Sequence, residues 1–203
     1  NQQGKSPDGQ SEFILVNNYK ELEQALKKKN TLIGIVTIEG GHVLGTGTEA
    51  TDKMSKDAII NKLTEHISTI KKWEFPPFVM NLSHHFWNHL AGHAKSFKRP
   101  INNIINQNKG KNKGITEAGW HVIRELLSTK NGKRILIDTK HMSAAARKEY
   151  YAFIGNHNYV NPEHKIPVIS SHTCANGFKT IDSSIAKADM IVKTRKTRLF
   201  KWS

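Results

Sequence analysis

Four short apolar runs, each followed by a residue that can bind a metal, constrain the fold of this chain more than any other feature. The runs cover residues 32–38, 78–83, 134–138 and 166–170, and the residues that follow them are Glu39, His84, His141 and His172. The spacing of these four residues leaves room each time for one strand–helix–strand crossover, which takes about 30 residues or more. Continuous apolar runs of this kind are typical of parallel strands buried on both faces. The sequence therefore predicts an α/β fold with a parallel sheet.

Amphipathic patterns in the intervals predict helices that cover this sheet. The residues expected to cap them at their N-termini are Asn18, Ser55, Thr116 and Ser143. The apolar faces predicted for the first three are Leu22, Ala25 and Leu26; Ile59, Leu63, Ile67 and Ile70; and Trp120, Ile123 and Leu127. We expect a single domain over residues 1–203, with a flexible leader at 1–12, loops at 95–114 and 156–164, and a poorly assigned tail at 178–203.

The four ligand-type residues are expected to converge. In a parallel barrel, all strand C-termini emerge on one face, and enzymes of that fold build their sites there. One carboxylate and several imidazoles, without a thiolate, suit Zn²⁺ or a similar divalent ion. The alternative is that these residues are hydrogen-bonded strand-end residues of an α/β domain.

Three other features of the sequence are weaker indications of a functional site. His85, His89 and His93 would share one face if their segment were helical, and such a row can bind zinc, but it lacks the glutamate of a helical metalloprotease motif. The glycines after residue 39 match neither a dinucleotide fingerprint nor a P-loop, so we interpret them as turn residues. The single cysteine, Cys174, excludes a disulfide framework and a Cys-based zinc cluster.

A net charge of +14 is typical of a nucleic-acid-binding module, and we keep this class of protein as an alternative. However, the Lys and Arg residues are spread along the chain, and aromatic residues are not interleaved with them as a stacking platform requires. We therefore expect no nucleic-acid partner. No apolar run approaches the roughly 20 residues of a membrane helix, and the polar N-terminus lacks an apolar signal core.

Five segments resemble the membrane (renal) dipeptidase family. They are GIVTIEGGHVLG, FVMNLSHHFWN, GITEAGWHVIRELL, RILIDTKHMS and IPVISSHTCANG, between residues 34 and 177. The resemblance implies a (β/α)8 TIM-type barrel and a zinc metallopeptidase that hydrolyses dipeptides with a metal-bound hydroxide. It implies that Glu39 bridges two zinc ions, that His141 and His172 are ligands of one of them, and that His84 contacts the substrate carbonyl. It also suggests an exported or membrane-associated enzyme and allows a homodimer.

Some features of that family have no counterpart here. The chain has no His-x-Asp pair like the one on the family's first strand, and no match to its late aspartate and its substrate-binding arginine. A full barrel takes about 250 residues. We therefore expect the central part of a barrel, incomplete at both ends, that binds metal weakly and hydrolyses little. A catalytically degenerate barrel that acts as a binding protein is the alternative.

Overall fold

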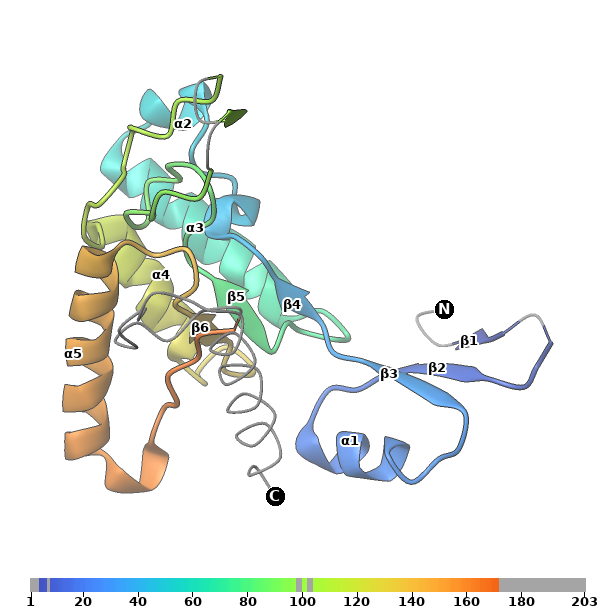
Figure 1. The fold of residues 1–203 in the computed structure, drawn as a ribbon. Coiled ribbons are helices and arrows are strands. Elements are labelled where there is room, and N and C mark those ends of the chain that lie inside the picture. The colour runs from blue at the N-terminus through green and yellow to red at the C-terminus, as the bar shows by residue number, and fades with distance from the viewer. Residues whose placement is uncertain (1–3, 7, 98–99, 102–103, 172–203) are drawn as a thin grey trace, which may run out of the picture. The chain divides into compact units, whose positions relative to one another are not determined.

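Three parallel strands form the sheet that carries the predicted ligands. They are β4 (Thr37–Ile38), β5 (Val79–Asn81) and β6 (Leu136–Asp138), and they lie side by side in chain order (Figure 1). This computed structural model describes residues 4–6, 8–97, 100–101 and 104–171. A single parallel bridge between Asp138 and Ile169 adds the predicted fourth run to the edge at β6. The predicted α/β class with parallel strands is confirmed.

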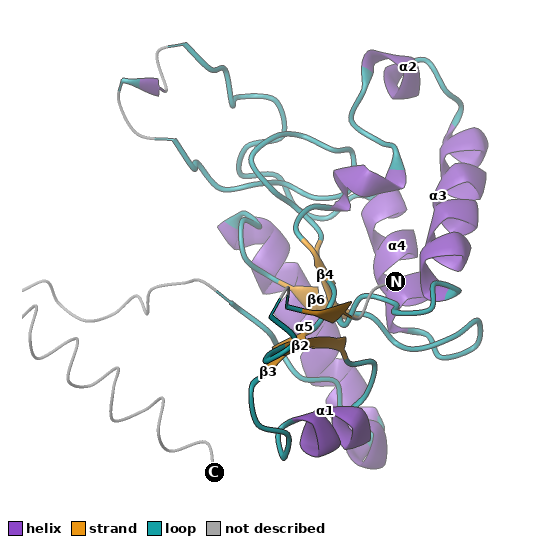
Figure 2. Ribbon diagram, turned by 90° about the vertical axis from the view of Figure 1, so that its right-hand side faces the viewer, coloured by secondary structure: helices purple, strands orange, loops and turns teal. Residues whose placement is uncertain are grey.

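Helices alternate with these strands as predicted. They are α3 (Lys56–Lys71), α4 (Glu117–Leu127) and α5 (Ala144–Val160) (Figure 2). Each begins after the predicted cap, because the hydroxyl of Ser55, Thr116 or Ser143 accepts a hydrogen bond from the backbone N–H three residues later. Figure 1 shows α4 and α5 to the left of β5 and β6.

One apolar core joins these helices to the sheet. Met80 and Ile137 are fully buried at the strand centres, and fully buried residues face them from the helices, including Leu63, Ile123 and Tyr150. The faces predicted for α3 and α4 are confirmed, with Ile59 and Trp120 partly buried at the margin of the core. Burial on this scale fixes the strands, and therefore the positions of the residues that follow them.

A second sheet precedes this core along the chain. It consists of β1 (Gly4–Lys5), β2 (Glu12–Leu15) and β3 (Thr31–Gly34), with β2 parallel to β3 and antiparallel to β1. The helix α1 (Tyr19–Ala25), capped by Asn18, connects β2 to β3. Thus residues expected to form a flexible leader contain β1 and the start of β2. Of the apolar stripe predicted for α1, Ala25 is buried but Leu26 is exposed.

The predicted strand over residues 32–38 is divided between the two sheets. Its first part belongs to β3 and pairs with β2, while Thr37 and Ile38 form β4 and pair with β5. Between them, the carbonyl of Val36 accepts a hydrogen bond from the N–H of Phe78. The single-strand prediction is wrong because apolar, β-branched residues favour extended backbone without specifying a pairing partner.

Short elements and loops complete the described residues. They include η1 (Gly41–Leu44), α2 (Glu49–Asp52) and η3 (Pro162–His164). The loop predicted at 156–164 is wrong in its first half, because α5 continues to Val160. No closed barrel is found among the described residues, whose strands form two separate three-stranded sheets. His172 and the tail from residue 178 lie outside the described residues.

Candidate metal site

Three of the four predicted ligands come together at the C-terminal ends of the parallel strands. Glu39 directly follows β4, His84 comes three residues after β5, and His141 comes three residues after β6. Because parallel strands end at the same edge of a sheet, these three side chains reach one place from distant parts of the sequence. His172, the fourth predicted ligand, lies outside the described residues.

The three side chains share one centre. The Nε2 atom of His84 lies 3.5 Å from Oε1 of Glu39, and the Nε2 atom of His141 lies 3.4 Å from the same oxygen. One ligand atom from each residue can be chosen so that all three lie within 4.8 Å of one another. Among the described residues, this is the group of histidines and acids whose spacing could hold a metal ion.

The cluster combines an exposed carboxylate with a buried imidazole. The Glu39 side chain is 54% exposed and the His141 side chain 9%. Burial lowers the pKa of His141 to about 4; the nearby His84 and His85 act in the same direction, and the hydrogen bond with Glu39 opposes them. His141 is therefore neutral at pH 7, which is the form in which an imidazole binds a metal.

His85 also belongs to this cluster, although the sequence argument placed it in the row with His89 and His93. Its ring centroid lies 3.8 Å from that of His84 and 4.9 Å from that of His141. Its Nδ1 atom is buried without a hydrogen-bond partner in the described part of the chain, and burial lowers its pKa. The His84-His85 pair after an apolar strand was the available signal, but it does not reveal that the ring of His85 lies close to those of His84 and His141.

The backbone at the site adopts conformations with positive φ. His141 has φ 66°, an uncommon value for a residue with a side chain, and Gly40 has φ 119°. A Cβ built on Gly40 would lie 2.4 Å from the ring of His42 and 3.2 Å from Cβ of His84. Glycine at position 40 therefore lets the chain turn sharply after Glu39 while the two imidazoles pack closely beside it.

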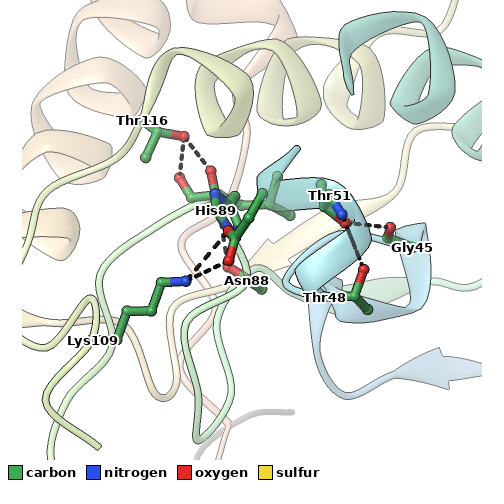
Figure 3. A network of polar contacts seen from close by, with 9 residues as sticks. Gly45, Thr48, Thr51, Asn88, His89, Lys109 and Thr116 are labelled. Carbon is green, nitrogen blue, oxygen red and sulfur yellow. Dashed lines mark hydrogen bonds and ion pairs between the residues drawn. The ribbon is translucent and has the colours of Figure 1, made fainter. Parts of the chain in front are cut away.

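The loop that carries His84 is held by a buried polar network. The side-chain amide of Asn88 donates to the carbonyl of Leu82 (2.7 Å), and its Oδ1 accepts from the N–H of Leu90. The hydroxyl of Thr116, the cap of α4, lies within hydrogen-bond distance of the carbonyls of His89 and Leu90 (Figure 3). These contacts connect the loop to the core and so restrict the position of His84.

The rival row of histidines does not form a metal site. Residues 84–94 are not helical, so His85, His89 and His93 do not share a face. His93 is buried, and its two ring nitrogens contact the carbonyls of Ala94 and Lys109. His89 instead contacts Asp52 at 2.6 Å. Lys109, shown in Figure 3, also contacts Asp52 and lowers the pKa of its carboxyl, mainly through a hydrogen bond.

The donor set fits a divalent transition metal. Imidazole nitrogen suits zinc, copper, iron and nickel, and a carboxylate is a common third zinc ligand. The three residues approach from separate strand ends, and one of them is exposed, so the centre is open to solvent on the side of Glu39. The geometry is that of a group able to hold a metal ion.

Comparisons with protein-family models, with curated proteins and with solved structures returned no match. Among the described helices, none has the length and apolar character needed to cross a bilayer.

Proposed function

We propose that this protein is a zinc-dependent dipeptidase, or the central part of one, that hydrolyses the peptide bond of dipeptides. The observation that best supports this proposal is the convergence of Glu39, His84 and His141 at one edge of a parallel sheet. The ligands of this proposal, Glu39, His141 and His172, are one carboxylate and two imidazoles, a donor set of catalytic zinc sites, which keep a position open for water or substrate. The resemblance of five segments to membrane dipeptidases supplies the reaction class.

We further propose that strands β4 to β6 are part of a (β/α)8 barrel. Two observations support this. The strands follow one another in chain order in the sheet, and helices alternate with them along the chain. Because strand–helix–strand crossovers are right-handed, a sheet that never reverses its order keeps all its helices on one face, as a barrel does.

Each site residue has a role in this proposal. Glu39 and His141, together with His172, would hold the metal. Zinc, when bound, lowers the pKa of its water toward about 7 and polarises a carbonyl. His84 would donate a hydrogen bond to the oxygen of the scissile carbonyl as negative charge develops there; such a donor contributes about 10²–10³-fold to the rate.

Hydrolysis of glycyl and alanyl dipeptides by the purified chain tests the proposal. We expect weak turnover that requires added zinc, disappears with a chelator and is absent in the Glu39→Gln variant, which keeps the side-chain shape but loses the charge. His164→Gln, on the exposed η3, is the matched control and should behave as the wild type.

Three results would count against parts of this proposal. Turnover that is absent, or equal in the wild type and Glu39→Gln, would contradict the dipeptidase assignment. Robust turnover would contradict the expected weakness of an incomplete barrel. Binding of a dipeptide without any hydrolysis would favour the degenerate, binding-only barrel.

A further inference from the structure

Two buried asparagines lie close together in the chain but differ in their hydrogen bonds. Asn81, the last residue of β5, is 6% exposed, and Asn88, in the loop that follows, is 2% exposed. The side-chain amide of Asn88 donates to the carbonyl of Leu82 at 2.7 Å, whereas the buried Nδ2 atom of Asn81 has no hydrogen-bond partner among the residues that the structure describes. A buried donor without a partner lowers stability, so Asn81 needs an explanation other than folding.

Asn81 shares one face of the sheet with acidic residues from the two neighbouring strands. Side chains alternate along a strand. Because Met80 and Ile38 pack in or against the apolar core, Asn81 and Glu39, which follow them, point to the opposite face. The register pairs Asn81 with Asp138 of β6, and continuing the register of β4 and β5 by one residue sets Glu39 beside Asn81 on its other side. The unpaired amide therefore lies between two positions that carry carboxylates.

The carboxylate of Asp138 already has partners in the backbone. Its Oδ1 atom accepts hydrogen bonds from the N–H of Lys140 at 2.9 Å and from the N–H of Ser171 at 3.2 Å. These bonds fix the end of β6, and Asp138 itself is buried. The amide of Asn81 is therefore available to a further acceptor.

We infer that Asn81 is a substrate-binding residue, and that its Nδ2 atom donates a hydrogen bond to a carbonyl oxygen of the bound peptide. This role rests on the proposed function and adds a contact to the same site. Carboxylates on both neighbouring strands repel an anionic oxygen, so the surroundings favour a neutral carbonyl over the terminal carboxylate of a peptide. Since Nδ2 is shielded from solvent in the free protein, the peptide reaches it from the side of Glu39, whose side chain is 54% exposed.

Nuclear magnetic resonance of the ¹⁵N-labelled chain, with zinc added, tests the contact directly. The side-chain amide of Asn81 gives a pair of signals, which is assigned by its loss in Asn81→Leu. Titration with alanylalanine should shift this pair until the site is saturated. The amide of Asn158, which donates to the carbonyl of Ile166 near the end of α5, is the control and should not shift. Unmoved Asn81 signals at saturating dipeptide, or a dipeptide that does not bind, would overturn the inference.

The affinity of the variant tests which oxygen is bound. Asn81→Leu keeps the size of the side chain but removes the amide. We expect the dissociation constant of alanylalanine, measured in the same titrations, to rise about tenfold, which is the order expected for one lost hydrogen bond. Alanylalanine amide, which lacks the terminal carboxylate, should lose the same factor. An unchanged dissociation constant, or a loss confined to the free acid, would contradict a contact with a carbonyl.

The stability of the ligand-free protein distinguishes substrate binding from a structural role. Because the amide of Asn81 is unpaired, Asn81→Leu should melt at the temperature of the wild type or above it. Asn88→Leu removes a paired amide of the same kind and should melt several degrees lower. A decrease in Asn81→Leu as large as that in Asn88→Leu would show that the amide of Asn81 serves folding, and the inference would be wrong.

The two proposals can fail separately. Binding of alanylalanine that shifts the Asn81 signals, without hydrolysis, would keep the inference and reject the proposed function. Zinc-dependent hydrolysis with unmoved Asn81 signals, and with the same KM in Asn81→Leu as in the wild type, would reject the inference and keep the proposed function.

Discussion

The two sheets of this protein have similar size but very different surroundings. In the sheet of β4 to β6, every residue of β5 and β6 is buried, whereas β2 and β3 contain no buried residue. Ile137 in β6 is fully buried, and Leu32 in β3 is 69% exposed. The candidate metal site lies at the end of the buried sheet, where packing fixes the strands, and not at the exposed one. Placement of His84 and His141 therefore accompanies burial of the strands before them, whereas Glu39 follows the partly exposed β4.

The largest expected effect comes from truncating one apolar residue in each sheet. Ile137→Ala removes fully buried methyl groups and leaves a cavity, so the free energy of unfolding should fall by about 2–5 kcal/mol. Leu32→Ala changes an exposed side chain and should cost within about 0.5 kcal/mol. Urea denaturation measures both. Equal losses in the two variants would mean that the exposed sheet contributes to stability as much as the buried one.

The pH dependence of stability should report on one residue of the candidate metal site, His141. The pKa of His141 is about 4 in the folded state and about 6.5 when unfolded, so the unfolded chain binds the proton first as the pH falls. The stability that the neutral His141 ring gives the folded state is fully present above pH 6.5. It is lost as the pH falls from 6.5 to about 4, and the free energy of unfolding falls by up to about 3 kcal/mol.

Urea denaturation of metal-free protein between pH 7 and pH 4.5 checks this expectation. His141→Asn removes the titrating ring and should flatten the pH dependence, while His164→Asn, in the exposed η3, should keep the wild-type profile. Parallel profiles for the wild type and His141→Asn would show that burial of this ring does not affect stability.

The smallest expected effect compares two helix caps, one in each region, whose side-chain oxygen accepts a hydrogen bond from the N–H three residues later. Ser143 caps α5 in the core; its hydroxyl accepts from the N–H of Ala146 and donates to the carbonyl of Lys113. Asn18 caps α1 beside the exposed sheet and accepts from the N–H of Glu21. We expect Ser143→Ala to lower the free energy of unfolding by about 1–2 kcal/mol and Asn18→Ala by about 0.5–1 kcal/mol. Thermal denaturation measures both losses of stability. A larger loss in Asn18→Ala than in Ser143→Ala would show that burial of a cap does not increase its contribution to stability.

Much of the buried region could be predicted from the sequence because its signals are local. A capping hydroxyl followed by apolar residues three and four apart predicts a helix, and α3 and α4 begin after Ser55 and Thr116. The end of α5 was missed, since polar residues such as His157 and Asn158 have no strong preference against a helix and tertiary contacts extend it to Val160. The division of residues 32–38 was missed because strand pairing is a long-range choice.

The sequence by itself determined that Glu39, His84 and His141 follow apolar runs, because the order of residues along the chain shows this directly. Their convergence was inferred from a general property of parallel sheets, and the three residues meet as expected. Only the tertiary structure decided that His85 joins them, that Nε2 of both flanking histidines faces one oxygen of Glu39, and that His141 is buried enough to stay neutral. Ring orientation and burial depend on the packing of segments far apart in the chain, and no local pattern of residues encodes them.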